Sequence, residues 1–309
     1  MPLPLADTPA QIDCRAPSTP VRRPAQLPAL LRLAHLSSLD APAVAVVWSL
    51  CVASAARIQL PGWVPLLLAL GTWSVYVADR LLDARRALAS SQAGNLRERH
   101  VFHWRHRRLL IPMASLAGVF AAAIVFSKMP AALRARDSVL AVAAICYFSG
   151  VHLPNTRQRT AARRRLLPFC WTPVQSKEFL VGVLFTAGCA APTLTRLQQH
   201  SAASPAALLF LIAYFACLAW LNCVAIDCWE AGRVSQIKAR AILLGCAGVL
   251  AGLTCSTTGH PRVALALVTA AVSALLLGVL DRTRHRLTPL SLRCAADLVL
   301  LAPLVCLLR

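Results

Sequence analysis

The segment Asp79-Arg-Leu-Leu-Asp83 carries two carboxylates at a spacing that could bind a divalent cation. Residues four apart project from one face of a helix about one turn apart, so the two acids could share one ion. Mg²⁺ prefers one or two carboxylates, retained waters and a substrate phosphate. The pair is therefore a candidate metal site that would present a diphosphate. The alternative is that Asp79 and Asp83 pair with Arg80, Arg85 or Arg86 and anchor a helix at a membrane interface.

A second acidic segment, Asn222-Cys-Val-Ala-Ile-Asp227-Cys-Trp-Glu230, ends another apolar stretch. The whole chain has only 12 Asp and Glu against 32 Lys and Arg, so four acids in two such places are unusual. These acids are therefore a second candidate site, because carboxylates are natural ligands of Mg²⁺. The alternative interpretation of this segment is a capped, solvated helix end.

The composition indicates the class of protein that must position these acids. Hydrophobic residues make up 58% of the chain and charged residues 14%, whereas soluble domains average roughly 45–50% and 25%. We therefore predict an all-α integral membrane protein, in which a flexible N-terminal tail (residues 1–29) precedes a bundle (residues 30–309) of about nine transmembrane helices. The nine apolar runs, read against a hydrocarbon core of roughly 30 Å, are 39–57, 63–83, 108–127, 138–153, 174–192, 205–226, 240–257, 262–280 and 290–308.

The distribution of cations predicts the orientation of this bundle. With nine spans and a cytoplasmic N-terminus, most Lys and Arg fall on cytoplasmic connections, as the positive-inside rule requires. The net charge of +20 then reflects topology and attraction to anionic lipid headgroups. Nucleic acid is not an expected partner, because the cations are scattered over connections and are not grouped with aromatics on a soluble module.

Both acidic segments fall on the cytoplasmic side in this topology, and an even number of crossings separates them. They could therefore converge over one cavity. The connection from Arg97 to Arg108 would form its roof, with Arg97 and Arg105 contacting phosphate or remaining a solvated connector. Lys177 poses a similar choice, because it either reaches the diphosphate or extends to the lipid headgroups.

A cytoplasmic acidic motif at the end of the second helix and another at the end of the sixth resemble those of the UbiA superfamily of intramembrane prenyltransferases. The resemblance spans about residues 30–308 and includes the basic, Leu-Gly-rich run from Lys177 to Gly188. It also includes Asn222 and Asp227 ahead of Gly232. Two positions depart from the family pattern: Val75 stands where an Asn is usual, and Glu230 follows Asp227 at a spacing of only three.

The resemblance implies a membrane prenyltransferase that moves an isoprenyl group from an allylic diphosphate to a lipophilic or aromatic acceptor with Mg²⁺. Asp79, Asp83, Asp227 and Glu230 would be its metal-binding and catalytic residues, with Asp79 and Asp83 holding one Mg²⁺ and Asp227 and Glu230 a second. Asn222 would contact the substrate. We expect it in a bacterial inner (plasma) membrane, with the N-terminus and both motifs cytoplasmic. The departures from the motifs favour an alternative, a degenerate UbiA-like protein that binds a lipid or isoprenoid without turnover.

Overall fold

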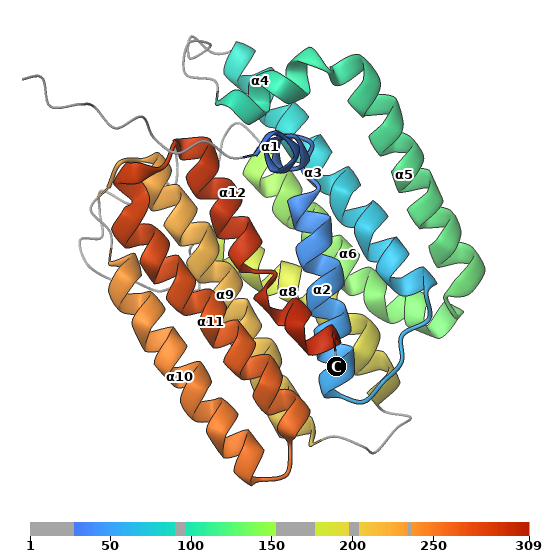
Figure 1. Ribbon diagram of the computed structural model, residues 1–309. Coiled ribbons are helices and arrows are strands. Elements are labelled where there is room, and N and C mark those ends of the chain that lie inside the picture. The colour runs from blue at the N-terminus through green and yellow to red at the C-terminus, as the bar shows by residue number, and fades with distance from the viewer. Residues whose placement is uncertain (1–27, 90–96, 153–176, 198–203, 234–235, 309) are drawn as a thin grey trace, which may run out of the picture.

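The structure, a computed structural model, describes residues 28–89, 97–152, 177–197, 204–233 and 236–308, and within these ranges it is helical without strands (Figure 1). Most of the predicted N-terminal tail, residues 1–27, lies outside the described residues. The helices are α1 (Ala29–Leu36), α2 (Asp40–Ala55), α3 (Trp63–Ala89), α4 (Glu98–Arg105), α5 (Arg107–Lys128), α6 (Ala131–His152), α8 (Lys177–Leu197), α9 (Pro205–Glu230), α10 (Ile237–Thr257), α11 (Pro261–Thr283), η3 (Arg284–Arg286), α12 (Pro289–Val299) and η4 (Ala302–Leu307).

The prediction of nine transmembrane spans is wrong, although helix forms in all nine predicted ranges. Among the described residues, six helical segments are long and apolar enough to cross a membrane. A seventh results if α1 and α2, which meet at an angle of 85°, count as one broken span. The predicted spans 63–83 and 138–153 fail because charged residues lie inside their helices: α3 carries Asp79, Arg80 and Asp83, and α6 carries Arg134 and Asp137. The chain is an integral membrane protein with fewer apolar spans than the sequence predicted.

The core of the bundle is centred on α2, α9 and α11. Trp48 of α2 is fully buried and stacks on Phe215 of α9, with ring centroids 4.5 Å apart. Its indole nitrogen donates a 2.8 Å hydrogen bond to the carbonyl oxygen of Leu300, which follows α12. A buried Trp needs such a partner for its N–H. This contact therefore ties the C-terminal segment to the first long helix.

Glycines let neighbouring helices approach closely where the bundle is tightest. A Cβ atom at Gly182 of α8 would lie 2.8 Å from the backbone nitrogen of Trp220 in α9. On α10, a Cβ at Gly245 would lie 2.5 Å from the side chain of Leu275 in α11. Small residues at helix contacts are typical of membrane bundles, where close van der Waals packing holds the helices together.

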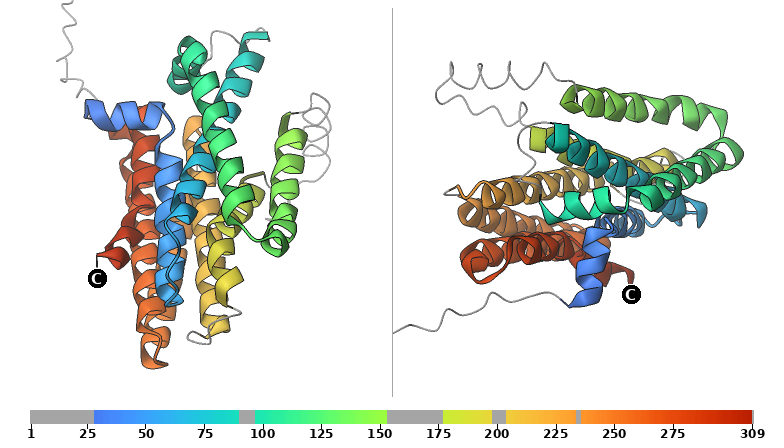
Figure 2. Two further views of the ribbon diagram at one scale, coloured as in Figure 1. Left: turned by 90° about the vertical axis from the view of Figure 1, so that its right-hand side faces the viewer. Right: turned by 90° about the horizontal axis from the view of Figure 1, so that it is seen from above.

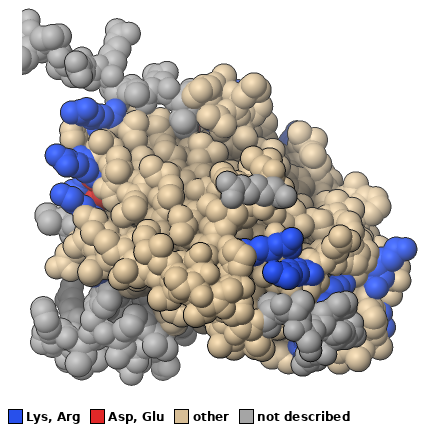
Figure 3. Space-filling view, turned by 60° about the horizontal axis from the view of Figure 1, so that its bottom comes forward, with Lys and Arg blue, Asp and Glu red and all other residues tan. Residues whose placement is uncertain are grey.

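One end of the bundle, the upper end in Figure 1, gathers the polar elements. Here α1 contacts both α4 and α12, and α4 contacts the end of α3. Figure 2 shows α1 lying across the long helices at this end. We call the region formed by α1, α4, the C-terminal ends of α3 and α9, and the start of α12 the polar end. A different face, in Figure 3, is mostly uncharged, with its Lys and Arg gathered toward two sides.

Candidate functional site

Asp79 and Asp83 lie one turn apart near the C-terminal end of α3, as the sequence predicted. Their side chains are 33% and 36% exposed, so both carboxylates remain accessible. Asp79 lies 3.5 Å from the guanidinium of Arg80, and Asp83 lies 4.0 Å from Nε2 of His100 in α4. Neither distance is that of a short, strong ion pair, so neither carboxylate is fully committed to a cation by these two contacts.

Several polar groups from other helices lie within electrostatic range of this pair. Tyr147 of α6 interacts electrostatically with Asp79, Asp83, Cys223 of α9 and Glu178 of α8. The electrostatic field at Tyr147 therefore has contributions from α3, α8 and α9. Lys177, at the start of α8, is exposed and lies within electrostatic range of Cys223.

The second acidic segment has a different environment. Glu230, whose side chain is 16% exposed, accepts hydrogen bonds from Arg99 at 3.0 Å and from Arg293 at 2.8 Å. Arg97 forms a third ion pair with the same carboxylate. Asp227, three residues earlier, is exposed and pairs with Arg233. Three guanidinium groups thus surround one carboxylate where a metal ligand was predicted.

The short helix α4 lies between the two acidic segments. On one side His100 is 4.0 Å from Asp83, and on the other Arg99 binds Glu230. His103 is fully buried; its Nδ1 donates to the carbonyl oxygen of Arg99 at 2.8 Å, and its Nε2 lies 3.3 Å from the hydroxyl of Ser38. Burial, followed by the nearby charge of Arg80, lowers the pKa of both His100 and His103 to about 4. Both imidazoles are neutral at physiological pH.

A cavity of about 520 Å³ opens at the polar end beside Glu230. Four arginines and two glutamates contribute to its wall, so its formal charge is positive. Ser291 and Thr288, at the start of α12, add hydroxyl groups. The charged lining residues are Arg32, Arg97, Glu98, Arg99, Glu230 and Arg293. Buried charges are normally paired, and here Glu230 is the carboxylate bound by three of the four guanidinium groups. The cavity suits an anion.

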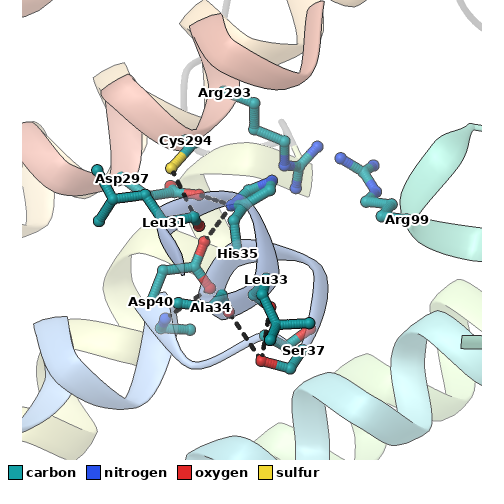
Figure 4. A network of polar contacts seen from close by, with 12 residues as sticks. Leu31, Leu33, Ala34, His35, Ser37, Asp40, Arg99, Arg293, Cys294 and Asp297 are labelled. Atoms are coloured by element: carbon teal, nitrogen blue, oxygen red, sulfur yellow. Dashed lines mark hydrogen bonds and ion pairs between the residues drawn. The ribbon is translucent and has the colours of Figure 1, made fainter. Parts of the chain in front are cut away.

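Asn222 lies at a third polar cluster. Its Nδ2 donates a 3.2 Å hydrogen bond to Oδ1 of Asp297 in α12. Figure 4 shows three other members of this cluster, His35, Asp40 and Asp297. On the other side, Nδ1 of His35 in α1 lies 2.6 Å from Oδ2 of Asp40 in α2 and 3.8 Å from Oδ2 of Asp297. Asn222 is thus directed to Asp297 rather than to a ligand shared with Asp227.

The donor groups fit one Mg²⁺ ion but not two. Asp79 and Asp83 offer accessible carboxylate oxygens on adjacent turns, which is a suitable donor set for an ion that also keeps waters and a phosphate. At Glu230, three guanidinium groups already neutralise the carboxylate and would repel a divalent cation. Of the two arginines predicted to contact phosphate, Arg97 binds Glu230 and Arg105 is exposed at the end of α4.

Sequence reasoning did not identify the partners of Glu230. Arg99 is 131 residues away and Arg293 is 63 residues away, so no local spacing connects them. The sequence feature that could have indicated these partners is the high density of arginines after α3. An isolated glutamate in such a basic chain could have been predicted to attract them. His35, Asp40 and Asp297 come from both ends of the chain and carried no shared motif.

Comparison with known proteins gives no match: no known protein family, no curated protein and no solved structure matches this chain.

Proposed function

We propose that this membrane protein binds an allylic isoprenyl diphosphate at the polar end and transfers its isoprenyl group to a lipophilic or aromatic acceptor, as UbiA-like prenyltransferases do. The observation that carries the proposal is the pair of partly exposed carboxylates of Asp79 and Asp83, one turn apart on α3 at the polar end. A polar site enclosed by apolar helices suits a substrate with a charged head and a long hydrocarbon tail.

Asp79 and Asp83 would hold Mg²⁺, which supplies neutralisation of the leaving diphosphate when bound. The bond between C1 of the isoprenyl chain and the diphosphate oxygen breaks, and its electron pair leaves with the diphosphate. The acceptor carbon forms a new bond to C1 and loses a proton. Lys177 would contact the anionic head, and α4, which packs against α3, would help to exclude the water that quenches an allylic cation.

An apolar cavity supports the same proposal. It has a volume of about 560 Å³, lies between α3, α5, α6 and α8, and is lined by residues such as Leu67, Leu68, Phe126 and Leu140. Leu67 lies on α3 about three turns before Asp79, so a chain running along α3 would connect the two regions. A tail of several isoprene units fits such a path.

The assay is diphosphate release by purified protein in lipid nanodiscs with Mg²⁺, a panel of isoprenyl diphosphates and candidate aromatic acceptors. Asp83→Asn keeps the side-chain shape and removes the charge, and should reduce release at least about 100-fold, since neutralising the leaving group is commonly the largest catalytic contribution. Asp281→Asn, which changes an acid of α11 that lines neither cavity, is the matched control and should retain wild-type release. Equal activity in all three proteins would contradict the proposal.

A second function, binding of a lipid or isoprenoid phosphate without turnover, is favoured by the arginines around Glu230. These groups give the cavity of about 520 Å³ a positive charge without completing a second metal site. In that case the protein would retain an isoprenyl diphosphate without releasing diphosphate. Binding would not depend on Mg²⁺, and Arg97→Gln would weaken it more than Asp83→Asn.

A further inference from the structure

The cluster of His35, Asp40 and Asp297 joins three helices at the polar end (Figure 4). One imidazole nitrogen and one oxygen from each carboxylate all lie within 4.8 Å of one another. His35 and Asp40 come from the consecutive helices α1 and α2, whereas Asp297 comes from α12, near the other end of the described residues. His35 is 5% exposed, and the side chains of Asp40 and Asp297 are 14% and 20% exposed. The group is therefore largely shielded from solvent.

Two carboxylates this close require a compensating positive charge or a proton between them. Arg293, the nearest guanidinium in sequence to Asp297, donates to Glu230 at 2.8 Å. Its charge is thus shared with a third carboxylate. The imidazole of His35 contacts both Asp40 and Asp297 through the same nitrogen, Nδ1. A cation bound between the two carboxylates would draw one ring nitrogen of His35 toward both of them, as observed.

Asn222 gives a second, independent indication of a ligand. It is 5% exposed and its amide reaches Asp297, yet its Oδ1 atom has no hydrogen-bond partner among the described residues. Leaving a buried amide oxygen unpaired costs about 1–3 kcal/mol. Because the two ends of an amide are interchangeable by rotation, Oδ1 can occupy the position beside Asp297. It would then be a fourth donor to an ion at the cluster.

We propose that His35, Asp40 and Asp297 bind a divalent transition-metal ion of the Zn²⁺ or Mn²⁺ type, with Asn222 as a fourth donor. An imidazole nitrogen with carboxylate oxygens suits such ions better than Mg²⁺, which prefers oxygen ligands alone. Ligands around tetrahedral Zn²⁺ lie roughly 3.3 Å apart when metal-ligand bonds are about 2 Å. The observed separations of 2.6 Å and 3.8 Å bracket this value.

The ion would fasten α1 to the bundle. The helix α1 has only eight residues and meets α2 at an angle of 85°. His35 lies at the end of α1, Asp40 at the start of α2 and Asp297 on α12, so one ion would fix the bend and the docking of α1 together. This site is distinct from Asp79 and Asp83 in its residues and in its preferred metal.

The test is metal content after chelator treatment and incubation with Zn²⁺ or Mn²⁺ alone, followed by desalting and elemental analysis of protein in nanodiscs. Wild type should retain about one ion per chain in the presence of excess Mg²⁺. Asp297→Asn and His35→Gln should each retain less than about a tenth of that amount. Asp137→Asn, which removes an acid from α6, should retain the wild-type amount.

Two outcomes would overturn the proposal. One is no retained metal in wild type, which would mean that the two carboxylates share a proton instead. The other is equal metal in wild type and both ligand variants, which would indicate binding elsewhere. Misfolding of a variant would also abolish metal retention, so Co²⁺ binding to wild type provides a second readout. Nitrogen and oxygen ligands predict visible Co²⁺ bands without a thiolate band, since the Cys294 thiol lies near the Leu31 carbonyl at 3.9 Å. A strong thiolate band would contradict this donor set.

Discussion

At the residue scale, acids that looked equivalent in the sequence have different roles in the structure. Asp79 and Asp83 remain accessible, whereas Glu230 is the centre of an arginine cluster and Asp227 is exposed beside Arg233. Both motifs were visible from the rarity of acids in the chain. Whether an acid such as Glu230 is enclosed by arginines depends on residues far away in sequence, and no residue spacing predicts that.

The arginine cluster predicts a large difference between two neighbouring substitutions. Glu230→Gln removes the carboxylate that binds Arg97, Arg99 and Arg293, and leaves buried guanidinium groups unpaired. It should lower the free energy of unfolding by on the order of 3 kcal/mol. Asp227→Asn, at an exposed ion pair, should change it by no more than about 1 kcal/mol.

Denaturant titration of the purified protein in detergent checks both values. If Glu230→Gln were as stable as Asp227→Asn, Glu230 would not be a structural anion. A metal-binding or substrate-binding role for it would then be favoured again.

At the element scale, α4 should be sensitive to acid. In the folded protein the pKa of His100 and His103 is lowered to about 4, against 6.5 for a free imidazole. The unfolded state therefore takes up protons first as the pH falls, so the stability of α4 is complete above about pH 6.5 and is lost as the pH decreases to about 4. Hydrogen exchange at residues 98–105 should accelerate over this range.

The matched control for this acid sensitivity is His103→Gln, which cannot be protonated. In this variant the rate of hydrogen exchange at residues 98–105 should depend less on pH below 6.5. Substitution of the exposed His106 should leave the dependence unchanged. Exchange that is independent of pH in wild type, after correction for intrinsic rates, would show that these imidazoles are not buried in the folded state.

The α8–α9 contact allows a second test at this scale, within one helix. Gly182→Ala would place a Cβ 2.8 Å from the backbone of α9 and should cost about 1–3 kcal/mol by overpacking. Gly188→Ala, on the same helix with no atom within 4 Å of the added Cβ, should be neutral or stabilising. Thermal unfolding of both proteins compares them directly, and equal midpoints would contradict the close contact.

At the scale of the whole molecule, the sequence predicted the class and the helices better than the number of spans. Hydrophobic content indicated a membrane bundle, and helices form over every predicted run. The count was wrong because α3 and α6 carry charges inside their helices. In α3 these charges include the candidate metal ligands Asp79 and Asp83. Charged residues inside a helix lower its mean hydropathy, which is the quantity used to identify membrane spans.

The proposed topology predicts that α10 separates two sides of a membrane. A reporter joined after Gly232, at the polar end, should be fluorescent as a cytoplasmic green fluorescent protein fusion and inactive as an alkaline phosphatase fusion. A reporter joined after Gly259, at the other end of α10, should behave in the opposite way. The same behaviour at both positions would contradict a spanning α10.

The central claim is that Asp79 and Asp83 bind an isoprenyl diphosphate together with Mg²⁺, and direct titration of a non-cleavable isoprenyl thiolodiphosphate tests it most plainly. Calorimetry in nanodiscs should show binding that requires Mg²⁺ and is weakened at least about 100-fold in Asp79→Asn/Asp83→Asn. The same affinity with and without Mg²⁺, or in the double variant, would contradict it.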